Sequence, residues 1–308
     1  MPTLALLTIF AFHTDDVWLN LHQFLYVLGR HEALMPDRTR RAQVNAPNDA
    51  DKGLAALTAE EQRAWREAVT FYAQDLSKLD AVFDERLVRT ANAIAAAGNR
   101  ATLDGTGVDP SLAAVLQKVA PIYRKAWWPA HERANRTWTE AIDSLVARHG
   151  EAILKFITGA YGLPWPADGF PVHVSGYANW AGAFSTSGNL LIISSLDPGN
   201  GGMAGLELSF HEAMHQWDRS MLEALAVHAR KLGKKLPNGL THALIWMTAA
   251  AAVRSVAPSH AGLADENGLW RTQPLATFKP MLDDVWLPYL NGKGTRDEAL
   301  ATIVARLH

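Results

Sequence analysis

The chain has 308 residues, of which 48% are apolar and 19% are charged, and its formal net charge is −2. This is the composition of an ordinary globular protein, and it argues against disorder. The small net charge gives no electrostatic reason to expect nucleic acid or an anionic membrane as a partner. The chain contains no cysteine, so any metal ion must be held by His, Asp or Glu side chains.

The N-terminal segment is apolar, and we expect residues 3–12 to form a strand or a buried extended arm. This segment is too short to span a bilayer and lacks the basic start of a signal peptide, so we predict no membrane span. It is compatible with the start of a mature chain whose export signal has been removed. That interpretation favours a periplasmic or secreted protein.

The first half of the chain has a helical pattern almost throughout. Apolar residues at helical spacing predict a helix over Val17–Leu28, capped by Thr14 or Asp15. Thr58 and Glu61 form a capping box that predicts a helix to about residue 79. The spacing predicts further helices at 81–97, 110–120, 126–149 and 151–161, with loops at 35–53 and 98–108. His13 and His22 lie in this half, and we interpret both as structural histidines.

The pattern changes after Gly162, and three short strands are expected. They are predicted at 170–177, 180–185 and 190–195, the last two joined by a turn at 187–189. Helices are then expected around 202–217, 220–235, 241–253, 275–289 and 295–307. The fold class expected is therefore α+β and predominantly helical, with a helical region 1–161 and a second region 162–308, packed as one unit. In the second region we expect a small mixed sheet beside the helix that begins near residue 202.

That helix carries the sequence His211-Glu212-Ala213-Met214-His215, an HExxH motif. Positions i and i+4 of an α-helix share a face, so the two histidines can direct their imidazoles at one ion. This is the spacing that a zinc ion needs for two of its protein ligands. Glu212 is rotated by about 100° from His211, where its carboxylate can act as general base on a metal-bound water.

At this motif the chain resembles the zincin metallopeptidases, and the layout of sheet, HExxH helix and helical C-terminal half suggests the gluzincin (thermolysin-like) branch. The resemblance covers about residues 170–220. It implies a zinc-dependent peptidase with a third ligand, a Glu, on a later helix. It also implies that residues 179–184 form an edge strand that binds an extended peptide, although an ordinary inner strand fits the sequence equally.

The third ligand is not evident, because residues 247–253 of the expected helix carry no carboxylate. A metzincin continuation is also absent, since Asp218 and Met221 stand where that pattern needs Gly and His. We rank His242 first as third ligand, then Glu223, then Asp218, which can equally support a histidine ligand. Glu207, one turn before the motif, is a further supporting candidate.

The function expected is metal-assisted hydrolysis of a peptide or a small amide with Zn²⁺ as cofactor and Glu212 as general base. An oxyanion would be stabilised by His242, if it is not a ligand, or by Tyr177. Two alternatives remain open. One is an inactive, metallopeptidase-like binding protein that has lost its third ligand, and the other is an enzyme that acts on a non-peptide amide or ester.

Overall fold

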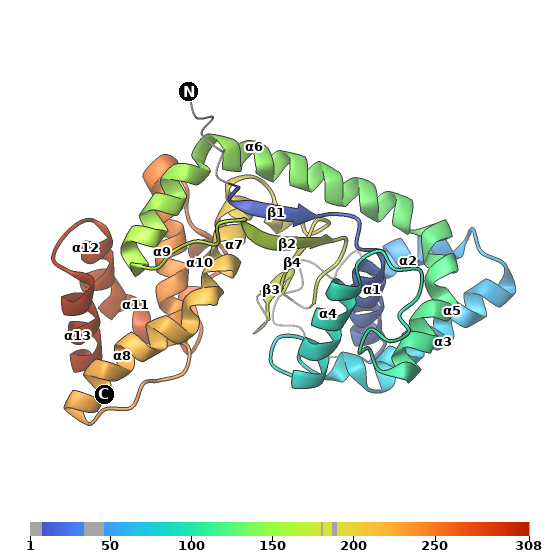
Figure 1. The fold of residues 1–308 in the computed structure, drawn as a ribbon, viewed down its shortest axis with the longest axis horizontal. Coiled ribbons are helices and arrows are strands. Elements are labelled where there is room, and N and C mark those ends of the chain that lie inside the picture. The colour runs from blue at the N-terminus through green and yellow to red at the C-terminus, as the bar shows by residue number, and fades with distance from the viewer. Residues whose placement is uncertain (1–7, 34–45, 180, 187–189, 308) are drawn as a thin grey trace. The chain divides into compact units, whose positions relative to one another are not determined.

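The computed structural model describes residues 8–33, 46–179, 181–186 and 190–307 (Figure 1). Close packing groups the chain into two compact units that interleave along the sequence. The motif unit, which carries HExxH, consists of Met1–Ile9, Ser144–Phe170 and Gly202–His308. The sheet unit consists of Phe10–Asp143 and Pro171–Gly201. Both units therefore take segments from either side of the boundary that the sequence suggested at 161/162.

The helices of the sheet unit surround an aromatic core. The ring of Phe24 lies 5.1–6.2 Å, between centroids, from the rings of Trp65, Tyr123, Trp127 and Tyr177. Stacked and edge-on aromatic pairs of this kind bury a large apolar area. The helices are α1 (Val17–Glu32), α2 (Ala46–Leu54), α3 (Ala59–Gln74), α4 (Glu85–Ala97), α5 (Pro110–Ala126) and the first part of α6 (Trp128–Tyr161).

A four-stranded sheet completes this unit, with the strand order β1-β2-β4-β3. Strands β2 and β4 are parallel, and β3 is antiparallel to β4. The expected small mixed sheet is thus confirmed, with shorter strands than the sequence indicated. Their bounds are β1 (Phe10–His13), β2 (Phe170–Ser175), β3 (Ala183–Ser185) and β4 (Leu191–Ser194).

Strand β3 is an edge strand, and it begins at Ala183, so it is shorter than the predicted strand 180–185. Asn179 has a positive φ of 27°, and its side-chain oxygen accepts hydrogen bonds from the backbone N–H groups of Ala181 and Gly182. An Asn side chain that bonds two residues ahead forms a turn and removes those donors from strand pairing. Trp180 and the expected turn at 187–189 lie outside the described residues.

The motif unit is built around α9 (Leu240–Val256), which packs against five neighbouring helices (Figure 1). Its alanines explain why: Ala249 and Ala252 are fully buried, and small side chains let neighbours approach closely. The absence of carboxylates from 247–253 therefore reflects packing. The neighbours of α9 are α7 (Gly202–Met214), α8 (Asp218–Leu232), α10 (Leu263–Glu266), α11 (Leu275–Asp284) and α12 (Trp286–Leu290), and the chain ends with α13 (Arg296–Arg306).

Among the helix boundaries that differ from the prediction, three run against a local sequence signal. Residues 46–54 form α2 and not a loop, and Gly53 lies against the ring of Trp127. Helix α5 continues through Pro121 to residue 126. Helix α6 is one helix of 34 residues, with no break at Gly150. A Cβ on Gly150 would lie 2.7 Å from Ile9 Cδ1, so this glycine permits a close contact instead of ending the helix.

The predominantly helical α+β class is confirmed. The capping box is confirmed as well, because Thr58 Oγ1 accepts from the Glu61 N–H while the Glu61 carboxylate accepts from the Thr58 N–H. Within the described part of the chain, no helix is both long and apolar enough to cross a membrane.

Candidate metal centre

Three imidazole rings from two helices meet in the motif unit. His211 lies on α7, His215 begins the 3₁₀ turn that follows, and His242 lies in the first turn of α9. The three ring centroids are 5.1–5.2 Å apart. Each ring offers one nitrogen, and these three nitrogens lie within 4.8 Å of one another. The Nε2 atoms of His211 and His242 are 3.2 Å apart. The structure thus brings His242, our first candidate for third ligand, to the two motif histidines.

Asp218 orients one of these rings. Helix α7 ends at Met214, and the tight turn over residues 215–217 returns the Asp218 carboxylate to His215, whose Nδ1–H donates to Oδ2 at 2.7 Å. A proton held on Nδ1 leaves the lone pair on Nε2, which is the nitrogen that a metal can use. Asp218 therefore supports a histidine, which is the second of the two roles that its sequence position left open.

The pKa shifts of two of the three rings suit a cation. Burial, followed by the nearby His242 and His215, lowers the pKa of His211 well below its usual value. Burial lowers the pKa of His242 to about 4. Burial also acts to lower the pKa of His215, but the hydrogen bond to Asp218 and the charges of Glu212 and Asp218 together raise it. Two of the rings are therefore neutral at pH 7, the form in which imidazole binds metals.

The spacing of two of these rings is compatible with a shared zinc ion. A zinc ion with Zn–N bonds of about 2.0–2.1 Å holds two nitrogens about 3.3 Å apart, close to the 3.2 Å between His211 and His242. Three imidazoles with no thiolate form a ligand set that zinc accepts, with the fourth position open. The Nδ1 atom of His211 is buried without a hydrogen-bond partner among the described residues, so only the Nε2 side of this ring has a polar neighbour.

Glu212 lies beside this group on α7 and is 7% exposed. Its negative charge is one of the causes that raise the pKa of His215, after the hydrogen bond to Asp218. A carboxylate in this place can accept a proton from a water held at the group.

The sequence did not point to Trp246. One turn after His242 on α9, its ring lies 3.6 Å from the His211 ring, centroid to centroid, at an angle of 31°. This contact holds the His211 ring in place of a hydrogen bond at Nδ1. Trp246 stands four residues after His242, and this helical spacing is the sequence signal that would have placed it on the same face of α9.

The other candidates lie elsewhere. Glu223 forms an exposed ion pair with Arg219, and Glu207 accepts hydrogen bonds from His260 and the backbone N–H of Leu263. Glu207 therefore supports a histidine outside the motif. The hydroxyl of Tyr177 donates to Asp49 in the sheet unit, and the buried His22 bonds Tyr72.

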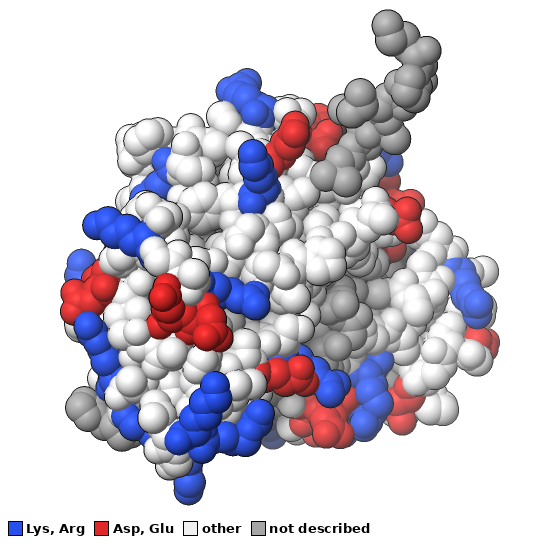
Figure 2. All heavy atoms as spheres, turned by 60° about the vertical axis from the view of Figure 1, so that its left-hand side comes forward, with Lys and Arg blue, Asp and Glu red and all other residues white. Residues whose placement is uncertain are grey.

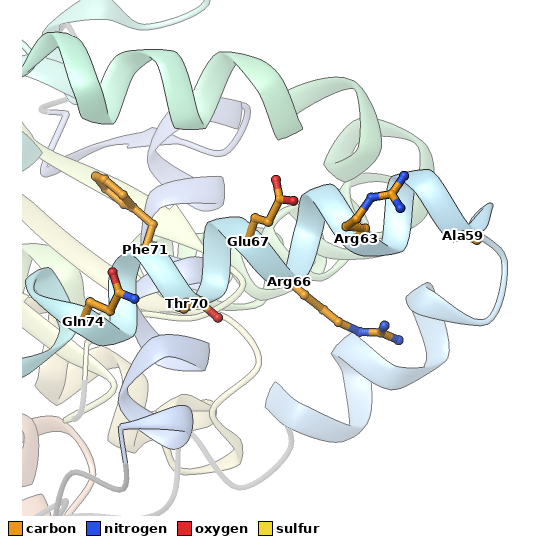
Figure 3. A pocket seen from close by; sticks show the side chains of 7 residues that line it. All are labelled: Ala59, Arg63, Arg66, Glu67, Thr70, Phe71 and Gln74. Carbon is orange, nitrogen blue, oxygen red and sulfur yellow. The ribbon is translucent and has the colours of Figure 1, made fainter.

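Other surface features do not add to the site. A hollow of about 680 Å³ is lined entirely by one face of α3, which carries Arg63, Arg66 and Glu67 (Figure 3). None of these residues belongs to the histidine group. Figure 2 shows acidic and basic side chains mixed on one face of the molecule.

No protein-family model, no curated protein and no solved structure matches this chain.

Proposed function

We propose that the chain is a zinc-dependent hydrolase, and most specifically a metallopeptidase. The observation that carries the proposal is the meeting of His211, His215 and His242 with Glu212 beside them. In this proposal the three Nε2 atoms hold Zn²⁺, and the ligand set is three histidines in place of the two histidines and glutamate that the gluzincin resemblance implies. His242 as a ligand is then not available as an oxyanion donor.

Zinc would supply a water of lowered pKa, about 7 in well-tuned sites, and would polarise the substrate carbonyl. The chain's own residues do the rest. Asp218 keeps the proton of His215 on Nδ1, and Trp246 holds the His211 ring. Glu212 accepts the proton of the attacking water and delivers it to the leaving amine.

The alternative of an inactive binding protein was motivated by the missing third ligand. His242 beside His211 supports the enzyme over that alternative, because the group has the number of protein ligands of a catalytic zinc site.

Elemental analysis after dialysis tests the metal. We expect about one zinc per chain in the wild type, a large loss in His242→Ala, and no loss in His149→Ala, which removes a histidine of the same unit outside the group. Wild-type protein without zinc, or His242→Ala with full zinc, would refute the ligand set.

Turnover tests the chemistry. Casein, short peptides, small amides and small esters would be assayed with wild type and Glu212→Gln. We expect the variant to keep its zinc and to lose activity by at least about 100-fold, the range for a general acid–base group. Activity on esters or small amides alone would exclude the peptidase assignment, and an active Glu212→Gln would exclude the general base.

A further inference from the structure

The sheet unit contains a second polar hollow, of about 500 Å³, that the proposed hydrolase does not use. Its walls come from β1, the start of α1, the end of α4 and β2. None of the described residues that line it is Lys or Arg. Its polar lining consists of His13, Asp15, Asp16, Asn92, Asn99 and His173.

His173 directs an unused acceptor at this hollow. It is only 9% exposed, and its Nδ1–H donates to the buried carboxylate of Asp16. In a neutral ring, a proton on Nδ1 leaves the lone pair on Nε2. Nε2 makes no hydrogen bond to any residue that the structure describes, and the ring lines the hollow. A ring nitrogen without a protein partner at the edge of the hollow is available to a ligand.

The two amides of the lining also present oxygens. Asn92 Nδ2 donates to the carbonyl of Val88 at 2.8 Å and to Thr186 Oγ1 at 3.2 Å. Asn99 Nδ2 donates to the Asp15 carboxylate at 2.8 Å. Because the amide nitrogens are engaged within the protein, the amide oxygens are the groups left for a ligand.

A planar ring forms one wall. His13 stacks on His173 with a centroid distance of 4.6 Å and an angle of 13°. Burial, and then the neighbouring His173, lowers the pKa of His13, so this ring is uncharged at pH 7. The hollow therefore combines two carboxylates, several acceptors and an aromatic face, and its described lining contains no lysine or arginine.

We propose that this hollow binds a small organic cation through a guanidinium group. A guanidinium is planar, carries only donors and pairs with carboxylates and aromatic faces, which are the groups that the hollow offers. A bare metal ion fits less well. Among the described residues, the group of His, Asp and Glu atoms close enough to share an ion is the one at His211, His215 and His242.

Calorimetric titration of the full chain with three probes of equal alkyl length tests the proposal. We expect n-butylguanidinium to bind saturably at one site, n-butylammonium to bind at least about fivefold more weakly, and n-butanol not to bind. Equal affinity for the ammonium would overturn the guanidinium assignment. Absence of saturable guanidinium binding would overturn the site.

Variants locate the binding. Asp15→Asn keeps the size of this exposed side chain and should weaken n-butylguanidinium binding at least about fivefold. Asp51→Asn, an exposed aspartate of α2 outside the hollow, is the matched control and should bind as the wild type does. Equal affinities of these two variants would contradict the proposal.

A measurement on the wild type avoids any folding defect of a His173 variant. In histidine-labelled protein, n-butylguanidinium should shift the ring nitrogen signals of His173 and His13 and leave those of His149 in place. Unchanged His173 signals at saturation would place the ligand elsewhere and refute the site.

Discussion

Replacing Asp218 with asparagine should weaken zinc binding through His215. The substitution removes the negative charge that favours His215 as a ligand, while the shape of the side chain is kept. If the amide nitrogen turns toward the ring, it donates to Nδ1 and forces the imidazole proton onto Nε2. That tautomer cannot bind the ion through Nε2.

The structure sets the size of the effect. Loss of such a partner typically costs 10–100-fold in metal affinity, or about 1.4–2.8 kcal/mol. The Asp218 side chain is 41% exposed, so solvent screens part of its charge. We therefore expect the lower end of the range, about a tenfold loss. Competition with a chelator of known zinc affinity at pH 7 measures this directly.

Asp283→Asn is a close control, because Asp283 lies in the same unit, is 40% exposed and pairs with Lys279. Its loss should leave zinc affinity unchanged. The reasoning would be refuted if the zinc affinity of Asp218→Asn were within about twofold of the wild-type value. It would also be refuted if Asp283→Asn lost as much zinc affinity as Asp218→Asn.

Burial lowers the pKa of His22 from 6.5 to about 4. Between these pH values the unfolded chain binds a proton at His22 and the folded chain does not. The free energy of unfolding should therefore fall by about 3 kcal/mol from pH 6.5 to pH 4. Denaturant titrations should show a shallower fall for His22→Asn, and equal slopes would contradict this. Trp246→Ala should lower the free energy of unfolding by about 3–5 kcal/mol and weaken zinc binding. Trp246→Phe keeps an aromatic ring against His211 and should retain most of the stability and most of the zinc affinity. Thermal unfolding with and without zinc measures both effects. Glu207→Ala should lower the free energy of unfolding by about 3–5 kcal/mol, because it leaves His260 unpaired. Glu223→Ala on the exposed face of α8 should lower it by less than about 0.5 kcal/mol. Similar losses in the two variants would contradict this prediction.

Features that depend on neighbouring residues could be predicted from the sequence. The capping box at Thr58 and the one-turn spacing of His211 and His215 are local, and both have the predicted form. Gly150 shows the limit of such signals. Because glycine disfavours helices, Gly150 predicted a break between two helices. The structure shows that a glycine stands there because Ile9, more than a hundred residues away in the sequence, packs closely against it.

The third member of the histidine group could be ranked but not assigned. His242 follows His215 by 27 residues, and its approach depends on how α8 and α9 return to α7. Glu223 and then Asp218 remained as lower-ranked candidates. The reason for the alanines of α9 was also hidden, because the sequence shows missing carboxylates and only packing shows a central helix.

The unbroken α6 helix governs how this protein can be dissected. Its C-terminal part belongs to the motif unit, where Tyr161 packs against Trp217 and the Ala160 carbonyl accepts from the Tyr289 hydroxyl. A gene fragment that starts at residue 162 would strip these anchors from the histidine-bearing helices and leave aromatic surface exposed. Expression trials should keep the whole polypeptide, and tags or protease sites belong at its termini.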